Sequence, residues 1–223
     1  MGRQTKEQVL YDVHSHNVNL NLRDIYLHSY YSKEDDGEPG VDYRQATTFI
    51  KNLQLLDQPP SKPILVHMHS VGGCWDNGMA MFNTIQFCES IVTILAYSQA
   101  SSMSGILLQA AHPYRIMMPD CHFMVHHGSI ALNDNSMAVR SAVDMNDKQM
   151  KRMLELFATN CQHGEFFKNR KSTTLKSVMA YIDKKIKDKS DWYMDAGEAV
   201  YFGFADHILG DGEYTTIKSL RTE

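Results

Sequence analysis

Apolar and polar side chains along this chain follow two periods, one typical of strands and one typical of helices. Residues 18–28 alternate apolar and polar side chains for part of their length, which predicts an early strand. Residues 43–56 carry apolar side chains three and four positions apart and predict a helix with one buried face. Residues 63–69 form an apolar run that predicts a second strand. Residues 33–40 are acidic, contain glycine and proline, and predict a surface loop.

The middle of the chain repeats strand and helix at short intervals. Alternation at this spacing indicates an α/β fold with largely parallel strands that are buried on both faces. The predicted elements are a helix over 76–88, a strand over 91–97, a turn over 98–101, a short buried helix over 102–111, and strands over 115–118 and 122–127.

The last third of the chain is predicted to be mainly helical. Residues 136–163 carry apolar side chains, many of them methionines, at the spacing of one long amphipathic helix. Residues 164–189 are rich in lysine and hold a second predicted helix over 174–187, whose charges we interpret as a solvated face. The residues from 194 onward predict a short helix capped near Gly203, followed by a strand-like tail.

Composition and charge exclude several classes of protein. The 223 residues are 43% hydrophobic and 22% charged, as is typical of a globular chain with one large domain or two small ones. A net charge of −4 argues against general nucleic-acid binding, which needs a basic surface. The uncharged stretch between Glu89 and Arg115 contains serines, a threonine and glutamines. It therefore predicts buried strand and helix rather than a membrane span.

The cysteines and the N-terminal residues bear on the compartment. The four cysteines have neither CxxC pairing nor zinc-ribbon spacing, and we interpret them as small core residues in a reducing environment. The N-terminal residues lack the apolar stretch of a secretory signal, and Lys6 stands where a myristoylation signal has serine or threonine. Together these features predict a cytoplasmic protein without a membrane partner.

A candidate nucleophile lies where an apolar strand passes into a short helix. Ser102 opens that helix among small residues, at the positive end of the helix dipole, where free backbone N–H groups can hold a developing oxyanion. A strand–turn–helix placement exposes the nucleophile in many hydrolases, although the GxSxG pattern is absent here. Serine is also a common N-cap residue, and Ser101 or Ser104 fits the pattern as well. The local pattern leaves these alternatives open.

Two further features suit a partner role beside such a serine. His126 ends an apolar strand, where a neutral imidazole can take a hydroxyl proton and return it to a leaving group. In a regular strand His127 faces the opposite side. Gly72 and Gly73 allow a close backbone approach that suits an oxyanion donor, and they equally suit an ordinary turn. A histidine bonded only to backbone is the simpler interpretation of His126 alone.

A metal site is the rival hypothesis, because two pairs of histidines lie two residues apart. No HExxH motif is present, so we expect neither a metal nor another cofactor. The pairs are His67 with His69 and His14 with His16, to which a metal site would add His122 or His126 and a carboxylate.

Four segments in order give a more specific signal than any single motif. They are HMHSVGGCWDNGMAMFNTIQF, ILAYSQASSMSGILLQAA, RIMMPDCHFMVHH and DWYMDAGEAVYFGFADHIL. This combination resembles the proteolytic subunit of the Clp ATP-dependent protease (the ClpP family, peptidase family S14) from about residue 12 to 209. The family patterns S-P-G-G, G-Q-A-A-S-M-G and M-I-H-Q-P correspond to residues 70–73, 98–104 and 124–128. The departures from these patterns include Val71, Ser98, Ser101 and His127-Gly128.

The resemblance implies a fold and a set of site residues. The fold is expected to be the ClpP/crotonase-like α/β spiral of ββα units, a single peptidase domain over 1–223 with an N-terminal segment over about 1–17 and a helical handle over about 135–190. Asp191 is assigned by the resemblance alone. The implied roles are Ser102 as nucleophile, His126 as general base and acid, Asp191 as orienting carboxylate, Gly73 and Met103 as oxyanion N–H donors, and Cys74, Trp75, Ser129 and Ile130 in strands that hold an extended peptide.

The function implied by the resemblance is that of an ATP-dependent Clp-type serine endopeptidase subunit, which hydrolyses unfolded polypeptides inside an oligomeric chamber. The expected assembly is a homo-oligomer, a heptameric ring or a double ring. ATP hydrolysis would belong to an AAA+ unfoldase partner, because this chain has no GxxxxGK[ST] loop. The alternatives are a ClpP-like phage assembly (prohead) protease and a non-catalytic ring subunit. A crotonase-type acyl-CoA enzyme ranks last, because it lacks the Ser–His–Asp pattern.

Overall fold

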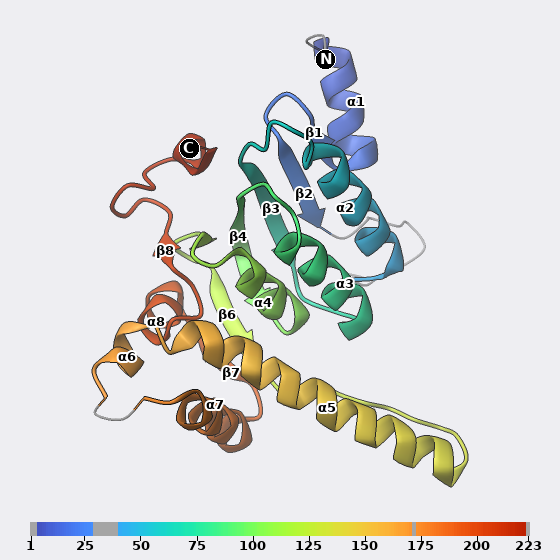
Figure 1. The fold of residues 1–223 in the computed structure, drawn as a ribbon, viewed down its shortest axis with the longest axis vertical. Coiled ribbons are helices and arrows are strands. Elements are labelled where there is room, and N and C mark those ends of the chain that lie inside the picture. Colours follow the sequence, from blue (N-terminus) through green and yellow to red (C-terminus); the bar gives the residue numbers. More distant parts are fainter. Residues whose placement is uncertain (1–3, 29–39, 171–172, 222–223) are drawn as a thin grey trace.

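The computed structural model describes residues 4–28, 40–170 and 173–221, and a central sheet with helices packed around it forms its framework (Figure 1). Most of the acidic loop predicted over 33–40 lies outside these residues. In the described chain the sheet has eight strands in the order β1-β2-β3-β4-β5-β8, with β6 pairing to β4 and β7 pairing to β6. The strands are β1 Val18–Asn19, β2 Asp24–His28, β3 Ile64–Ser70, β4 Val92–Ser101, β5 Arg115–Met117, β6 His122–Val125, β7 Trp192–Met194 and β8 His207–Ile208.

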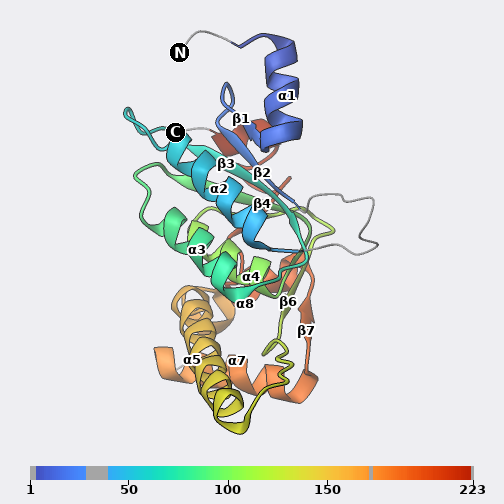
Figure 2. The same ribbon diagram turned by 90° about the vertical axis from the view of Figure 1, so that its right-hand side faces the viewer.

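Some helices pack on the sheet, whereas part of the long helix α5 projects from it (Figure 1). Helices α2, α3 and α4 lie together against one face of the sheet (Figure 2). On the other face Leu65, Leu95 and Ile116 form a separate apolar cluster with Leu220 from the C-terminal segment. The helices are α1 Lys6–His16, α2 Tyr43–Leu56, α3 Trp75–Gln86, α4 Met103–Leu108, α5 Ser136–Cys161, α6 Glu165–Lys168, α7 Leu175–Lys189 and α8 Ala196–Phe202, with the 3-10 turns η1 Gln109–Ala111 and η2 Ile217–Arg221.

The predicted α/β organisation is confirmed, because the central pairs β2–β3, β3–β4 and β4–β5 are all parallel. The turn predicted over 98–101 is wrong, since β4 continues to Ser101. The reason is a change of neighbour along β4: Ile94 and Ala96 pair with β5, whereas Gln99 and Ser101 pair with β6. The polar side chains near the end of β4 therefore belong to a strand that has acquired a new partner.

The single early strand predicted over 18–28 is also wrong. It is an antiparallel pair, β1 and β2, joined by a turn in which Asn19 accepts hydrogen bonds from the N–H groups of Asn21 and Leu22. Arg23 completes this turn with a φ of 58°. Alternation of apolar and polar residues continues through such a tight turn, so the pattern alone does not reveal the reversal.

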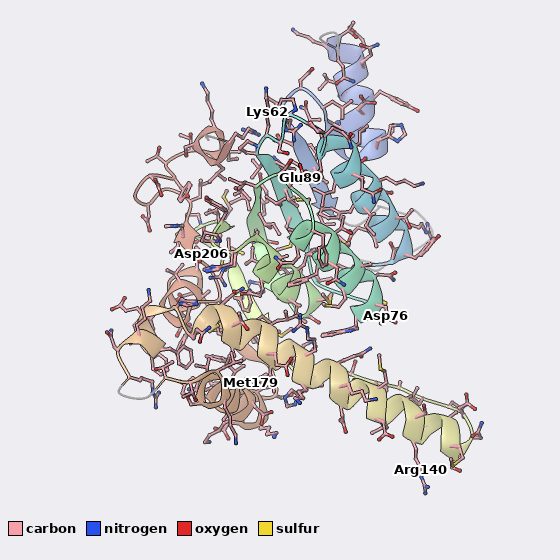
Figure 3. All side chains as sticks on the ribbon, viewed as in Figure 1. Lys62, Asp76, Glu89, Arg140, Met179 and Asp206 are labelled. Carbon is pink, nitrogen blue, oxygen red and sulfur yellow. The ribbon has the colours of Figure 1, made fainter. Side chains whose placement is uncertain are left out.

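The two long helices predicted in the last third of the chain are present as α5 and α7, and the short α6 lies between them. The far half of α5 projects beyond the rest of the protein, with Arg140 near its outer end (Figure 3). Its near half packs into the core through Met153, Phe157 and neighbouring residues. Among the described residues, no helix combines the length and the apolar character that crossing a bilayer requires.

Candidate active site

Ser102 occupies the corner between β4 and α4 in a conformation that serine rarely adopts. Its φ is 55° and its ψ is −126°, outside the allowed regions that non-glycine residues normally occupy. The corner is held by a hydrogen bond from the Ser102 N–H to the carbonyl of Met124 on β6, at 3.0 Å. Strained backbone of this kind persists only where the surroundings enforce it, and it concentrates at functional sites.

The geometry separates Ser102 from the two neighbouring serines that the sequence left as alternatives. Ser101 and Ser104 are both buried, whereas Ser102 lines a cavity. The Ser104 hydroxyl lies 2.8 Å from the carbonyl oxygen of Ser70 and accepts a hydrogen bond from the Ser101 N–H at 3.1 Å. Ser104 therefore ties the end of β3 to the Ser102 corner, and Ser102 is the serine whose hydroxyl is accessible from the cavity.

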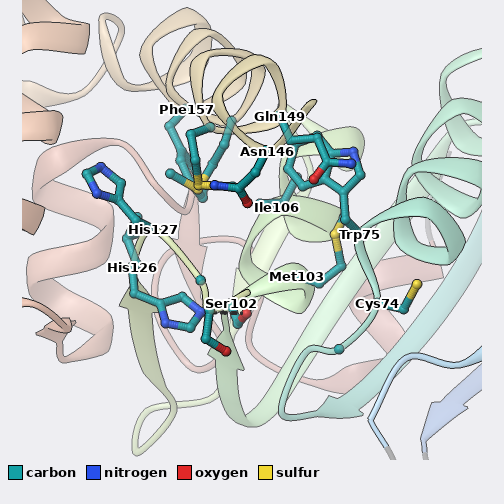
Figure 4. A pocket seen from close by; sticks show the side chains of 16 residues that line it. Cys74, Trp75, Ser102, Met103, Ile106, His126, His127, Asn146, Gln149 and Phe157 are labelled. Carbon is teal, nitrogen blue, oxygen red and sulfur yellow. Dashed lines mark hydrogen bonds between the residues drawn. The ribbon is translucent and has the colours of Figure 1, made fainter. Parts of the chain in front are cut away.

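His126 lies directly after β6, with its ring against the Ser102 hydroxyl (Figure 4). Its Nε2 is 2.7 Å from Ser102 Oγ, a hydrogen-bond distance. His127 has a different partner: its Nε2 is 3.1 Å from Oδ1 of Asp183 on α7. The alternation expected of a regular strand does not apply to it, because β6 ends at Val125. A neutral His126 ring can accept the serine proton at Nε2, which is the arrangement that activates a hydroxyl nucleophile.

Asp191 lies on the other side of the His126 ring. Its Oδ1 is 3.5 Å from His126 Nδ1, which is longer than an ordinary N–H···O hydrogen bond and within ion-pair distance. The position follows from the antiparallel pairing of β6 with β7, in which Val125 faces Trp192. The Asp191 side chain is 47% exposed, so water competes for its carboxylate.

The backbone around Met103 and Gly73 determines where their N–H groups point. Met103 is the first residue of α4, so its N–H has no acceptor within the helix. Val41 accepts a hydrogen bond from Cys74 and donates one to Gly72, in a parallel bridge opposite Gly73. In this bonding pattern the N–H of Gly73 points away from Val41.

Gly72 explains why a glycine pair precedes the site. Its φ is 99°, and a Cβ at this position would lie 2.6 Å from the carbonyl oxygen of Ser101 and 2.8 Å from the nitrogen of Met103. The segment before α3 can therefore approach the Ser102 corner only because the side chain is absent. Gly73 follows directly and lines the same cavity as Ser102.

A cavity of about 380 Å³ opens beside Ser102. Its wall is about equally polar and apolar, and α5 adds the amide side chains of Asn146 and Gln149. Cys74, Trp75 and Ser129 line it, whereas Ile130 is not among its lining residues. The apolar lining residues include Trp75, Met103, Ile106, Val125, Met150, Met153 and Phe157.

The expectation that Cys74, Trp75, Ser129 and Ile130 lie in strands is wrong. Trp75 is the first residue of α3, and the described residues 126–130 belong to no helix or strand. The physical reason is that a strand is defined by hydrogen bonds to a neighbour. Among the described residues, Gly73 bridges only Val41, and no strand pairs with residues 126–130.

The histidines of the rival metal hypothesis are used differently. His67 is buried, its Nδ1 lies 2.8 Å from the Tyr97 hydroxyl, and its Nε2 lies 3.2 Å from a carboxylate oxygen of Asp24. Within residues 4–28, 40–170 and 173–221, no group of three or more histidine, cysteine or acidic side chains is arranged to hold a metal ion. His67 is therefore a hydrogen-bonded residue of the sheet.

Comparison with known proteins identifies the family of this chain. The model of the Clp protease family matches residues 37–212. The chain is 28% identical over 174 residues to the ATP-dependent Clp protease proteolytic subunit 1 of Streptomyces coelicolor, covering 78% of this chain and 72% of that protein. It is also 28% identical over 170 residues to the proteolytic subunit 3 of Streptomyces avermitilis, covering 76% of this chain and 70% of that protein.

The chain therefore belongs to the Clp protease family, a family of peptidases. Within that family it is a divergent ClpP-type proteolytic subunit with the expected mixed α/β fold.

The sequence analysis missed two groups of residues around the site. Asn146 and Gln149 reach the cavity from α5, on the same helix face as Met150, Met153 and Phe157. Their spacing of three, four and seven residues is a detectable signal, because such positions share one side of a helix. The contact of His127 with Asp183 joins elements far apart in the sequence, and no local pattern indicates it.

Proposed function

We propose that this chain is a serine endopeptidase whose catalytic residues are Ser102, His126 and Asp191. The observation that carries the proposal is the 2.7 Å contact between Ser102 Oγ and His126 Nε2 at a strained corner facing a cavity. The 3.5 Å approach of Asp191 to the other ring nitrogen supports the same assignment. The triad is recognised by geometry and roles, so its chain order of Ser, His and Asp is no obstacle.

The proposed reaction proceeds through an acyl-enzyme. Ser102 Oγ attacks the peptide carbonyl while His126 Nε2 takes the hydroxyl proton. The N–H groups of Gly73 and Met103 donate hydrogen bonds to the oxyanion of the tetrahedral intermediate. As the C–N bond breaks, His126 returns the proton to the amine, and water then releases the acyl group by the same steps. Asp191 keeps the Nδ1 proton in place and stabilises the imidazolium form.

We propose that the substrate is an unfolded polypeptide lying across the cavity. Within the described part of the chain, Gly73 is bridged only by Val41 and residues 126–130 pair with no strand, so an extended peptide can add main-chain hydrogen bonds there. Cys74, Trp75 and Ser129 would contact the peptide, and the cavity would take one of its side chains. Ile130, which is exposed and outside the lining, would contact only a peptide that extends past the cavity.

We propose further that residues 1–223 act as one peptidase domain in a homo-oligomeric ring, single or double, with residues 135–190 as its handle. The outer half of α5 supports this, because it exposes large apolar side chains, Met137 at 70% and Met145 at 52%. Such a surface is typical of contacts between subunits. The Streptomyces relatives are named ATP-dependent, and we assign ATP hydrolysis to an unfoldase partner. We also propose that the protein is cytoplasmic, because the four cysteines of this chain are all free, as is usual in a reducing compartment.

The test is hydrolysis of a fluorogenic peptide by the wild type, Ser102→Ala and Ser98→Ala. Ser98 is an exposed serine on β4, the strand that leads to Ser102. Its replacement therefore controls for effects of a serine-to-alanine change that are unrelated to the nucleophile. We expect Ser98→Ala to match the wild type and Ser102→Ala to lose at least about 10⁴-fold in kcat. Full activity of Ser102→Ala, or none in the wild type with or without an added unfoldase, would refute the assignment; the second result would favour a non-catalytic ring subunit. Mass in solution, as a multiple of 25.5 kDa, tests the ring.

A further inference from the structure

His127, the residue after the proposed catalytic histidine, is hydrogen-bonded to helix α7. The His127 ring turns away from His126 (Figure 4), and its Nε2 lies 3.1 Å from Oδ1 of Asp183. The second carboxylate oxygen of Asp183 lies 2.6 Å from Nζ of Lys187, so both oxygens of Asp183 are occupied. This contact links the end of β6, which places His126, to the side of α7.

Asp183 and the proposed catalytic carboxylate belong to one continuous segment. α7 is fixed to the protein by the buried side chains of Val178, Ile182 and Ile186. It ends at Ser190, whose N–H donates to the carbonyl of Ile186 at 2.7 Å, and Asp191 follows at once. A movement of the C-terminal half of α7 therefore moves Asp191 directly.

Two chain segments at the site are linked to each other by two side-chain contacts. His126 and His127 are neighbours in the chain, and Asp183 is joined to Asp191 through two turns of α7. The His127–Asp183 bond joins these two segments at one point, and the 3.5 Å approach of Asp191 to His126 joins them at another. The β6–β7 pairing fixes the backbone after Asp191, and the buried side chains of α7 hold the helix before it. The His127–Asp183 bond adds a direct side-chain link between α7 and the residue next to His126.

We propose that His127 and Asp183 are a positioning pair that holds Asp191 against His126. The inference rests on the proposed function, since it assigns a role within that catalytic site. Neither residue touches the reacting atoms, so the pair acts through Asp191. Because an exposed carboxylate already at 3.5 Å is easily lost to water, a small displacement of α7 is enough to uncouple it from the imidazole.

The chain provides a matched control on the same helix. Asp188 forms an i,i+4 pair with Lys184 at 2.5 Å, just as Asp183 does with Lys187. The Asp188 side chain is 54% exposed and that of Asp183 is 28% exposed. Asp183→Asn and Asp188→Asn thus remove the same charge and the same kind of lysine pair from α7. Only Asp183 contacts His127.

The experiment compares these variants in peptide turnover and in the rate at which a small fluorophosphonate modifies Ser102. We expect Asp183→Asn to lower kcat and the modification rate about tenfold, with KM within about twofold, because the reacting geometry and not substrate binding is disturbed. Asp188→Asn should stay within about twofold of the wild type. His127→Ala should match Asp183→Asn, whereas His127→Gln, which retains an N–H donor for Asp183, should recover most of the rate.

A second comparison separates positioning from a general loss of structure. In an Asp191→Asn background, Asp183→Asn should slow fluorophosphonate modification by less than about twofold, because no carboxylate remains to be positioned. An equal loss in both backgrounds, or no difference between Asp183→Asn and Asp188→Asn, would overturn the proposal. If Asp183→Asn is not properly folded, as judged by a lack of cooperative unfolding, the proposal is tested by His127→Ala and His127→Gln instead. Equal rates in these two variants would overturn it. Ser102→Ala distinguishes failure of the positioning proposal from failure of the proposed function, because activity retained in this variant refutes the proposed function itself.

Discussion

Replacing Asp206 by asparagine should destabilise this protein strongly, because Asp206 is the counter-ion of a buried arginine. The Arg115 side chain on β5 is only 1% exposed. Its guanidinium donates to both oxygens of Asp206, at 2.6 and 2.8 Å, and also to Gln109 at 2.5 Å and to the carbonyl of Gly203 at 2.8 Å. The Arg115 N–H donates to Asp206 as well, at 2.9 Å. The pair thus joins β5 to the segment after α8.

The magnitude follows from what remains after the substitution. In Asp206→Asn the guanidinium keeps its charge and its two neutral acceptors but loses its counter-ion in a buried site. Breaking a buried pair in this way costs about 3–5 kcal/mol. With a urea m-value of about 2–3 kcal/mol/M for a chain of this size, the unfolding midpoint should fall by about 1–2.5 M.

The assay is urea unfolding followed by circular dichroism. The control is the double variant Arg115→Met with Asp206→Leu, which removes both charges and should lose less stability than Asp206→Asn alone. A loss below about 1 kcal/mol in Asp206→Asn would refute the reasoning, because it would mean that the arginine charge does not need its partner.

The same pair gives the stability a defined pH dependence. Burial alone would raise the pKa of Asp206, but the hydrogen bonds and the charge of Arg115 outweigh it, so the pKa of this carboxyl is lowered. A carboxyl with a lowered pKa in the folded state contributes its full stability above its unfolded pKa of about 3.9. That contribution is lost as the pH falls through the folded pKa, so the acid-induced loss below about pH 4 should be smaller in Asp206→Asn than in the wild type.

Three further predictions concern other parts of the molecule. Gly72→Ala should abolish peptide turnover while the circular dichroism spectrum stays native, because its Cβ would lie 2.6 Å from the carbonyl of Ser101; retained activity would contradict this packing. Arg221→Ala should cost about 3 kcal/mol in urea unfolding, because it strips the buried Asp24 of the charge that holds the C-terminal segment; an unchanged midpoint would contradict it. In the native protein iodoacetamide should alkylate the exposed Cys74 and spare Cys161, whose thiol pKa is raised by burial; equal rates by mass spectrometry would contradict the burial.

Much of the fold was predictable where an element carries its own pattern. The helix predicted over 43–56 matches α2, because its apolar side chains follow one face and Asp42 caps its first turn. Phe87 shows the limit of the same reasoning. It fits the apolar pattern of the helix predicted over 76–88, yet α3 ends at Gln86 and Phe87 is 88% exposed. Burial depends on where a helix stops, and the apolar pattern does not mark that end.

Elements that depend on distant partners were not predictable. β7 has only three residues, and it exists because it pairs with β6, more than sixty residues earlier in the chain. That pairing places Asp191, which explains why the residues alone could not distinguish it from the other aspartates and the family resemblance was needed. Ser102 was different, because its strand–helix junction left a local signal. Even so, the local pattern did not distinguish it from Ser101 and Ser104. The family resemblance made that choice, and the structure shows that Ser102 lines the cavity while the other two are buried.

The most direct measurement of the central claim is the site at which a fluorophosphonate modifies the intact protein, mapped by mass spectrometry of its peptides. We expect modification of Ser102, strongly slowed in His126→Ala, because Nε2 at 2.7 Å is what activates the hydroxyl. Modification of a different serine, or the same rate at Ser102 with and without the His126 imidazole, would contradict it.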